Sequence, residues 1–159
     1  MGKNKKDERN KEIRNAKVHH NYTVEDTYEA GIVLRGTEVK SVRLGKAQIA
    51  DAFARVDRGE VFLYHAHINE YVFGNLNNHN PVRPRKLLLN KREIRRIQAA
   101  IEAGGKTLIP TRMYIKHGLV KVELGVCASK KLYDKRETLK KRIAMREAER
   151  EIKKVHQRG

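Results

Sequence analysis

The sequence has no tryptophan, a single cysteine and only nine phenylalanine and tyrosine residues. Because Cys127 stands alone, an internal disulfide framework is excluded, and we expect a reducing compartment with Cys127 buried as a small apolar residue at a strand end. With so few aromatic rings, the core must be built from valine, isoleucine, leucine and alanine. No apolar run is long enough to span a bilayer and no signal-peptide core is present, so the sequence predicts a cytoplasmic protein that does not enter a membrane.

Motifs that carry catalysis are also missing. Gly31 and Gly36 have the first spacing of a phosphate-binding loop, but the lysine and hydroxyl pair that should follow is replaced. His65 and His67 are expected on one side of a strand without a third metal ligand. Cys127 has no partner motif for a nucleophile, and no cluster of carboxylates suits a metal-dependent nuclease. The sequence therefore predicts a protein that is not an enzyme and that has no metal site and no cofactor.

Acidic residues are scarce beside basic ones: 19 aspartates and glutamates stand against 36 lysines and arginines, which gives a formal net charge of +17. The excess is +4 in residues 1–20, +6 in residues 21–127 and +7 in residues 128–159, so the short ends carry most of it. Such an excess predicts a polyanionic partner, with nucleic acid ahead of an anionic membrane surface. The C-terminal tail is too polar to lie in a membrane interface, which favours nucleic acid.

Alternation of apolar residues predicts several strands and two hairpins. The first strand is expected over Tyr22–Leu34, where Gly31 indicates a bulge or a close approach of another backbone. The hairpins are expected in residues 51–68 and 107–127, and each turns at a residue that is followed by glycine. Five or six short antiparallel strands must curl to hide their edges, which predicts a small, mostly β, partly open barrel.

Two short helices are expected beside these strands. The first covers residues 37–45 and turns three apolar residues inward: Val39, Val42 and Leu44. The second covers residues 91–103, because Asn90 is a good N-cap and Glu93 stands three residues later. Its outer face is basic, for which the ordinary explanation is the solvation of an amphipathic helix: Lys91, Arg92, Arg95 and Arg96.

Three segments are expected to lack fixed structure by themselves. Residues 1–20 form a basic N-terminal extension that is read as disordered, with ordering of its last residues on a partner. Residues 74–84 are rich in asparagine and proline, which indicates a mobile loop. Residues 129–159 form a basic tail with helical propensity but without one apolar stripe. We predict a barrel over residues 21–128, followed by a tail that is disordered when free and helical only against a partner.

The joint between barrel and tail has an unusual composition. Residues 129–136 read Ser-Lys-Lys-Leu-Tyr-Asp-Lys-Arg, with four cations, one carboxylate and one aromatic ring. A ring among cations suits a nucleobase that stacks above a phosphate. The plainer alternative is a solubilising end to a small domain.

Several short stretches follow one another in a specific order and spacing. They are Glu29-Ala30-Gly31, Gly36-Thr37-Glu38-Val39-Lys40-Ser41, Arg43, Gly45-Lys46-Ala47, Arg85-Lys86-Leu87-Leu88-Leu89-Asn90, and Lys130-Lys131 with Asp134-Lys135-Arg136. Together they resemble the SsrA-binding protein (small protein B) family, and the resemblance runs from about Asn15 to the C-terminus. Two departures are Ser129, where the family usually has glycine, and Ala16, where it commonly has a second base.

The resemblance implies a barrel of the oligonucleotide-binding (OB) type and a partner RNA. The family binds the tRNA-like part of transfer-messenger RNA and rescues ribosomes stalled on messages without a stop codon, in the process called trans-translation. Its RNA-facing residues carry over to Glu29, Leu88 and Asn90, and we place Lys40 and Arg43 on the same surface. The joint and tail resemble the part that enters the decoding centre and the empty message channel; its residues here are Lys130, Lys131, Tyr133, Asp134, Lys135 and Arg136.

Each of these residues has a plainer alternative. Glu29 is either a base-contacting carboxylate, a surface strand residue, or a partner that orients Lys40 or Arg43. Leu88 is otherwise a core residue, and Asn90 otherwise only an N-cap. In the tail, Tyr133 either stacks on a ribosomal RNA base or packs against the barrel.

Two other classes of protein remain open. One is a general ribosomal protein, and the other is an RNA-processing enzyme, for which no catalytic set is present. We expect a monomer whose partners are transfer-messenger RNA and the ribosome.

Overall fold

The computed structural model describes residues 12–73, 78–130 and 132–158, and these residues form nine strands and four helices. These residues fall into two compact units, one that ends at Ser129 and one that begins at Lys130. The first unit contains β1 (Ile13–Arg14), α2 (Val18–Asn21), β2 (Tyr22–Ile32), α3 (Gly36–Arg43), β3 (Ala47–Gln48), β4 (Phe53–Asp57), β5 (Glu60–Tyr64), β6 (His67–Ile68), β7 (Arg85–Leu88), α4 (Lys91–Glu102), β8 (Lys106–Lys116) and β9 (Leu119–Ser129). The second contains α5 (Leu132–Arg158).

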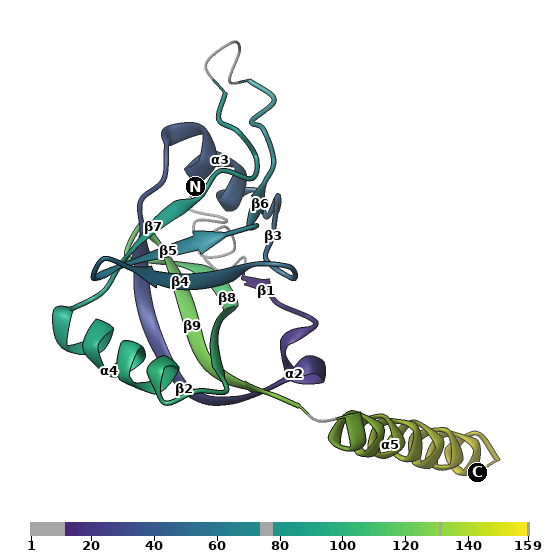
Figure 1. Cartoon of the computed structure of the whole chain (residues 1–159). Helices are drawn as coiled ribbons and strands as arrows, with labels where there is room; N and C mark the ends of the chain where they lie inside the picture. The colour runs from purple at the N-terminus through teal and green to yellow at the C-terminus, as the bar shows by residue number, and fades with distance from the viewer. Residues whose placement is uncertain (1–11, 74–77, 131, 159) are drawn as a thin grey trace. The chain divides into compact units, whose positions relative to one another are not determined.

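Six of the strands close into a ring (Figure 1). The order is β8-β4-β5-β7-β2-β9, every pair is antiparallel, and β9 returns to β8 through the long second hairpin. The ring closes between β4 and β8 at the pair Ala54 and Leu108, while β1 adds to β8 and β3 pairs separately with β6. Closure leaves few unpaired strand edges. The predicted antiparallel, OB-like barrel with short flanking helices is confirmed.

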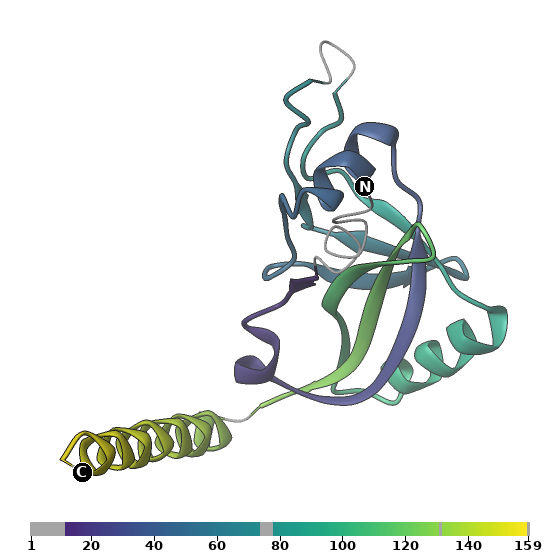
Figure 2. The same cartoon turned by 180° about the vertical axis from the view of Figure 1, so that it is seen from behind.

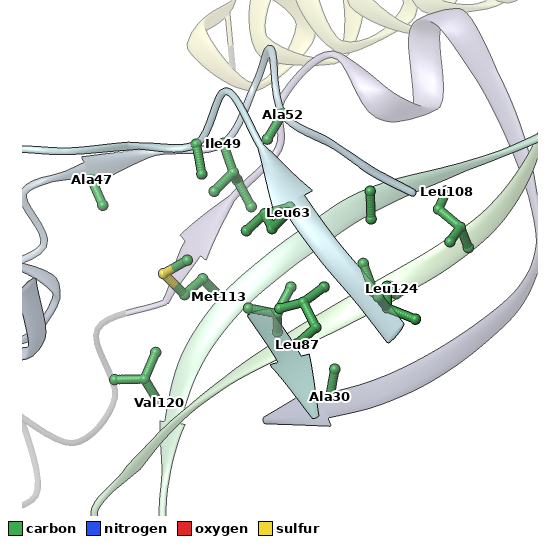
Figure 3. Close-up of a cluster of buried hydrophobic side chains, with 14 of the residues drawn as sticks. Ala30, Ala47, Ile49, Ala52, Leu63, Leu87, Leu108, Met113, Val120 and Leu124 are labelled. Atoms are coloured by element: carbon green, nitrogen blue, oxygen red, sulfur yellow. The ribbon is translucent and has the colours of Figure 1, made fainter. Parts of the chain in front are cut away.

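Aliphatic side chains fill the barrel, as the shortage of aromatic residues predicts. Figure 3 shows Leu63, Leu87, Leu108 and Leu124 pointing from different strands into one interior. Each is essentially inaccessible to solvent, and each such burial contributes about 1.5–3 kcal/mol to folding. Cys127 is buried too, in a smaller cluster, and burial raises the pKa of its thiol to about 11. The expectation that it is a structural residue is confirmed.

Both hairpins turn where the sequence predicts. Arg58 and Gly59 have φ of 50° and 77°, and His117 and Gly118 have φ of 52° and 77°. Two successive positive φ values give the turn whose twist matches that of the strands. The strand expected over residues 60–68 is interrupted at His65, whose φ is 60°, so that β5 ends and β6 pairs elsewhere.

The expected disorder of the N-terminal extension is wrong for residues 12–20; residues 1–11 lie outside the described residues. Ile13 pairs with β8, and Val18 is buried in the cluster that contains Cys127. The Asn15 side-chain amide donates to the carbonyls of Ile49 (3.2 Å) and Pro110 (2.9 Å). A buried amide with two acceptors holds this segment on the barrel, and polar composition alone could not reveal those acceptors.

The two helices beside the barrel are placed on opposite sides of it, as Figures 1 and 2 show. In α4, Ile97 is fully buried and Ile94 and Ile101 pack beside it, as predicted. In α3, Val42 is buried as predicted, but the inward position of Leu44 is wrong, since 49% of it is exposed. Glu38 lies on the buried face instead.

The tail is helical from Leu132 to Arg158. Its apolar residues are exposed on more than one side of the helix: Leu139, Ile143, Met145 and Ile152. This agrees with the absence of a single apolar stripe. That the helix forms only against a partner stays a prediction.

Candidate RNA-binding surface

The outer face of four neighbouring strands brings several of the predicted residues together. Gly31 on β2 pairs with Leu88 on β7 and with Lys121 on β9, and Lys121 pairs in turn with Tyr114 on β8. Because alternate residues of a strand share a face, Glu29 lies on the same side as Gly31. Leu88, Glu29, Lys121 and Tyr114 therefore belong to one outer surface of the barrel.

Leu88 is an exposed apolar residue on this surface. Half of it (51%) is accessible, so the alternative that Leu88 belongs to the core is wrong. A Cβ atom added to Gly31 would stand 3.3 Å from the Leu88 Cβ, which confirms the expected close approach at Gly31. The bulge of β2 lies earlier, between Val24 and Asp26. Glycine at position 31 leaves the Leu88 side chain uncovered, and an uncovered aliphatic group suits the face of a base.

Glu29 is held in place by two donors from β8. Its carboxylate accepts a hydrogen bond from the Tyr114 hydroxyl (2.9 Å) and another from Lys116 Nζ (3.2 Å). These bonds lower the pKa of Glu29, while burial and the bond to Glu29 raise the pKa of Tyr114 to about 12. The carboxylate thus stays charged and oriented at neutral pH. The alternative that Glu29 orients Lys40 or Arg43 is wrong, because its partners are on β8.

Arg112 fixes the ring of Tyr114. Its guanidinium lies 4.5 Å from the centre of that ring and donates to Glu123 (2.7 Å) and Glu12 (2.8 Å). Those two bonds raise the pKa of Arg112. We did not predict the roles of Arg112, Tyr114 and Lys116, although the alternation of β8 places all three on its outer side.

Asn90 stands at the start of α4, two residues after Leu88. It is exposed, and its backbone N–H donates to the Glu93 carboxylate (3.3 Å), as a capping box requires. The four basic residues of the adjoining helix are all exposed: Lys91, Arg92, Arg95 and Arg96. The N-cap role of Asn90 is confirmed and leaves its side chain at a basic surface.

Lys40 and Arg43 are exposed on α3, which follows the end of β2 that carries Gly31. Lys40 Nζ lies 5.2 Å from the centre of the Tyr71 ring. The position of α3 is fixed by Glu38, whose carboxylate is completely buried and accepts bonds from the Arg85 Nε (2.5 Å) and the Arg83 Nε (3.0 Å).

Burial raises the pKa of Glu38, but the bonds from Arg83, from the Arg35 backbone and from Arg85 outweigh burial, so the net pKa lies below its ordinary value. The pKa of Arg85 is lowered, chiefly by burial, with partial compensation from Glu38. The pair therefore stays ionised, and the ion pair ties α3 to β7.

The predicted tail residues belong to the second unit. Lys130 begins that unit, and Lys131 lies outside the described residues. The backbone of the remaining residues forms the first turns of α5, where Arg136 is exposed: Tyr133, Asp134, Lys135 and Arg136. Their side-chain roles stay predictions.

In the part of the chain that the structure describes, no group of three histidine, cysteine, aspartate or glutamate side chains is placed to hold a metal ion. Within the same residues, no helix has the length and apolarity needed to cross a membrane.

Comparisons with known proteins identify the family. The family model described as SmpB protein matches residues 12–154. The chain belongs to the SmpB family. A relative named SsrA-binding protein from Geobacillus kaustophilus (strain HTA426) is 54% identical over 137 residues, which cover 86% of this chain and 88% of the relative.

Further members of the SmpB family are similar to this chain over most of its length. The SsrA-binding protein of Caldicellulosiruptor bescii is 54% identical over 152 residues, 96% of this chain and 94% of the relative. A solved structure described as "tmRNA-SmpB: a journey to the center of the bacterial ribosome" is 43% identical. It covers 76% of this chain and 85% of the solved chain, with a TM-score of 0.65.

Proposed function

We propose that this chain is a non-enzymatic adaptor that binds the tRNA-like domain of transfer-messenger RNA and delivers it to stalled ribosomes in the cytoplasm. Membership of the SmpB family, the name SsrA-binding protein of its relatives and the likeness to the tmRNA–SmpB structure support the proposal. The observation on this chain that carries it is the exposed Leu88, set against Gly31 and beside the oriented carboxylate of Glu29.

The outer face of the barrel supplies shape recognition. Folded RNA is read mainly through its shape and its unstacked loop bases. Leu88 offers an apolar face for such a base, and Glu29 accepts from a base amino group because Tyr114 and Lys116 keep its carboxylate aimed and charged. Asn90 adds a side-chain amide at the start of α4. Lys40 and Arg43 contact phosphates, which strengthen binding without selecting a sequence.

The tail is the second RNA-facing part of the proposal. Lys130, Lys131, Lys135 and Arg136 supply cations, and Tyr133 supplies a ring that stacks on a base of the decoding centre. The helix α5 enters the message channel when no message fills it, and a filled channel leaves the helix no room. Folding coupled to entry discriminates between empty and occupied ribosomes at some cost in affinity.

The proposal is tested by binding of the purified protein to transfer-messenger RNA and to an ordinary tRNA across a series of salt concentrations. We expect both RNAs to bind the protein at low salt through phosphate contacts, whose strength falls steeply as the salt concentration rises. We expect the complex with transfer-messenger RNA to outlast the complex with tRNA. Equal affinities that decline together would contradict shape recognition. Stoichiometric presence on every ribosome would instead favour a general ribosomal protein.

The role of the Glu29 carboxylate is tested with Tyr114→Phe, which removes the hydroxyl that orients it and keeps the ring. We expect affinity for transfer-messenger RNA to fall by about tenfold, because a correctly placed charged hydrogen bond is worth about 1.5–3 kcal/mol and part of it survives through Lys116. Glu29→Gln is expected to lower the affinity for transfer-messenger RNA by the same factor or more.

Glu60→Gln is the matched control, since Glu60 is an exposed carboxylate on β5 that pairs with Lys86 (3.1 Å). Glu60→Gln should bind transfer-messenger RNA with the affinity of the wild type. Tyr114→Phe, Glu29→Gln and Glu60→Gln should all unfold at nearly the same urea concentration. A normal affinity for both Tyr114→Phe and Glu29→Gln would remove Glu29 from the site.

A further inference from the structure

An exposed aromatic tip projects from the barrel at the end that carries α3. The tip consists of Tyr71, Val72 and Phe73, in the loop that leads away from β6 past α3 (Figure 1). Val72 and Phe73 are each 76% exposed, more than the other large apolar residues known to be exposed in the described chain. Because Val72 and Phe73 are adjacent and both exposed, they form a contiguous apolar surface, and such a surface points to a partner.

The base of this tip is rigidly built. The Asn78 amide accepts from the Tyr71 backbone N–H (3.0 Å) and donates to the Tyr71 carbonyl (2.7 Å). The neighbouring His79 is buried, and its ring bonds to the Thr37 hydroxyl and the Ile68 carbonyl, each at 2.8 Å. The expectation of a mobile loop is therefore wrong for residues 78–84, and residues 74–77 lie outside the described residues. Buried polar groups hold the tip out from the barrel.

The rings of the tip have a defined arrangement. Phe73 meets Tyr71 edge to face, with ring centres 5.5 Å apart and an interplanar angle of 69°. Lys40 Nζ lies 5.2 Å from the centre of the Tyr71 ring. Tyr71 is thus the supporting ring, half-buried between a cation and Phe73, and Phe73 is the ring that remains available.

Charge beside the tip decides the kind of partner. Exposed cations on and after α3 are Lys40, Arg43 and Lys46, against one exposed carboxylate of the loop, Glu70. Alternating aromatic rings and cations bind single-stranded nucleic acid, since a base stacks on the ring while its phosphate meets the cation. An apolar pocket of a protein would gain nothing from the cations.

We infer that the aromatic tip is an RNA-stacking site, in which Phe73 stacks on an unpaired base and Lys40 contacts the adjacent phosphate. The inference rests on the proposed function only in taking RNA as the partner. The stacking ring is carried by the loop after β6, whereas Leu88 and Glu29 are carried by β7 and β2, and Lys40 is the residue that the two sites share. Its base comes from either transfer-messenger RNA or ribosomal RNA, which the experiment distinguishes.

Phe73→Trp provides the direct probe, because the chain contains no other tryptophan. A base that stacks on the indole quenches its fluorescence. Val82→Trp is the matched control, since Val82 is 50% exposed in the segment that returns from the same loop. Both variants are titrated with transfer-messenger RNA and, separately, with ribosomes. We expect strong quenching of Trp at position 73 by one of these RNAs and much weaker quenching at position 82.

The outcomes separate the sources. Quenching by transfer-messenger RNA alone assigns the base to that RNA, and quenching that needs ribosomes assigns it to ribosomal RNA. A blue-shifted and brighter emission at position 73 would mean an apolar protein pocket and would overturn the inference. Unchanged emission with both RNAs would overturn it as well.

Binding affinity gives a second readout. Phe73→Leu keeps an apolar side chain but removes the ring, and Phe73→Tyr restores a ring. We expect Phe73→Leu to weaken binding to the quenching RNA by about tenfold, and Phe73→Tyr to bind as the wild type does. Equal affinities for the leucine and tyrosine variants would contradict stacking.

This inference and the proposed function fail in different ways. If the wild type prefers transfer-messenger RNA over tRNA but Phe73→Leu binds RNA with the affinity of the wild type, only the stacking role of the tip is contradicted. If the wild type shows no such preference, the proposed function is wrong. The ribosome titration still decides whether Phe73 stacks on RNA.

Discussion

Glu38 is the residue on which the position of α3 depends. It is fully buried among two arginines and a backbone N–H, and Arg85, one of those partners, is fully buried as well. Removing one charge of a buried pair leaves the other without compensation and costs about 3–5 kcal/mol. We therefore expect Glu38→Gln to lower the free energy of unfolding by about that amount, measured by urea denaturation at pH 7. Glu60→Gln, which breaks an exposed pair, should change it by less than about 1 kcal/mol.

The same pair predicts a dependence on pH. Because the pKa of Glu38 in the folded protein lies below its ordinary value of 4.5, its contribution is complete above that pH and is lost as pH falls through the folded pKa. The stability gap between the wild type and Glu38→Gln should accordingly be constant from pH 6 to 8 and narrow below pH 4.5. A gap that widens in acid would show that the carboxylate is not stabilised by its arginines.

At the scale of elements, the two hairpins carry most of the barrel, and their turns set the register of the strands. His117 has a positive φ of 52°, which costs a residue other than glycine or asparagine some strain. Since Asn-Gly is the preferred pair for this turn, we expect His117→Asn to raise the free energy of unfolding by about 0.5–1 kcal/mol. His117→Val should lower it, because a β-branched residue tolerates positive φ poorly. The free energy of unfolding is measured by urea denaturation for the wild type and the two variants. A valine variant as stable as the asparagine variant would contradict the expected strain at position 117.

Local pattern was sufficient for β2, for the strands of the two hairpins and for α4, because alternation and capping act over a few neighbouring residues, but it did not predict the short strands β1, β3 and β7. It failed for Glu38, since a buried carboxylate needs arginines 45 and 47 positions further along the chain. It failed for Asn15 for the same reason, because one acceptor, on Pro110, lies 95 positions away. Of the candidate site, the resemblance supplied Glu29, Leu88 and Asn90, whereas the β8 residues that orient Glu29 required the register between strands.

On the scale of the whole molecule, charge and packing are divided between two units. The first unit buries its apolar residues in a closed barrel, and the second is a helix whose described apolar residues are exposed. The residues from 128 onward carry a net charge of +7. The core of the first unit is built from that unit's own residues, so we expect it to survive changes in the tail.

Truncation after Leu132 tests this division. Because the barrel keeps its core and outer face, we expect its unfolding midpoint and its preference for transfer-messenger RNA to remain, with some loss of affinity at low salt from the missing cations. Tagging of stalled nascent chains in a reconstituted translation system should disappear, since no helix can enter the message channel. Tagging that survives truncation would contradict the proposed role of the tail.

A subtler change separates the helix from its charge. Ala144 lies within α5, and Ala144→Pro removes a helical hydrogen bond at a cost of about 3 kcal/mol while it keeps every cation. If the tail must fold in the channel, Ala144→Pro should reduce tagging strongly and leave binding to transfer-messenger RNA unchanged, whereas Ala144→Ser, which keeps the helix, should tag nearly as the wild type does. Equal tagging by the proline and serine variants would mean that the tail acts through its charge alone, because the two differ chiefly in their capacity to form a continuous helix.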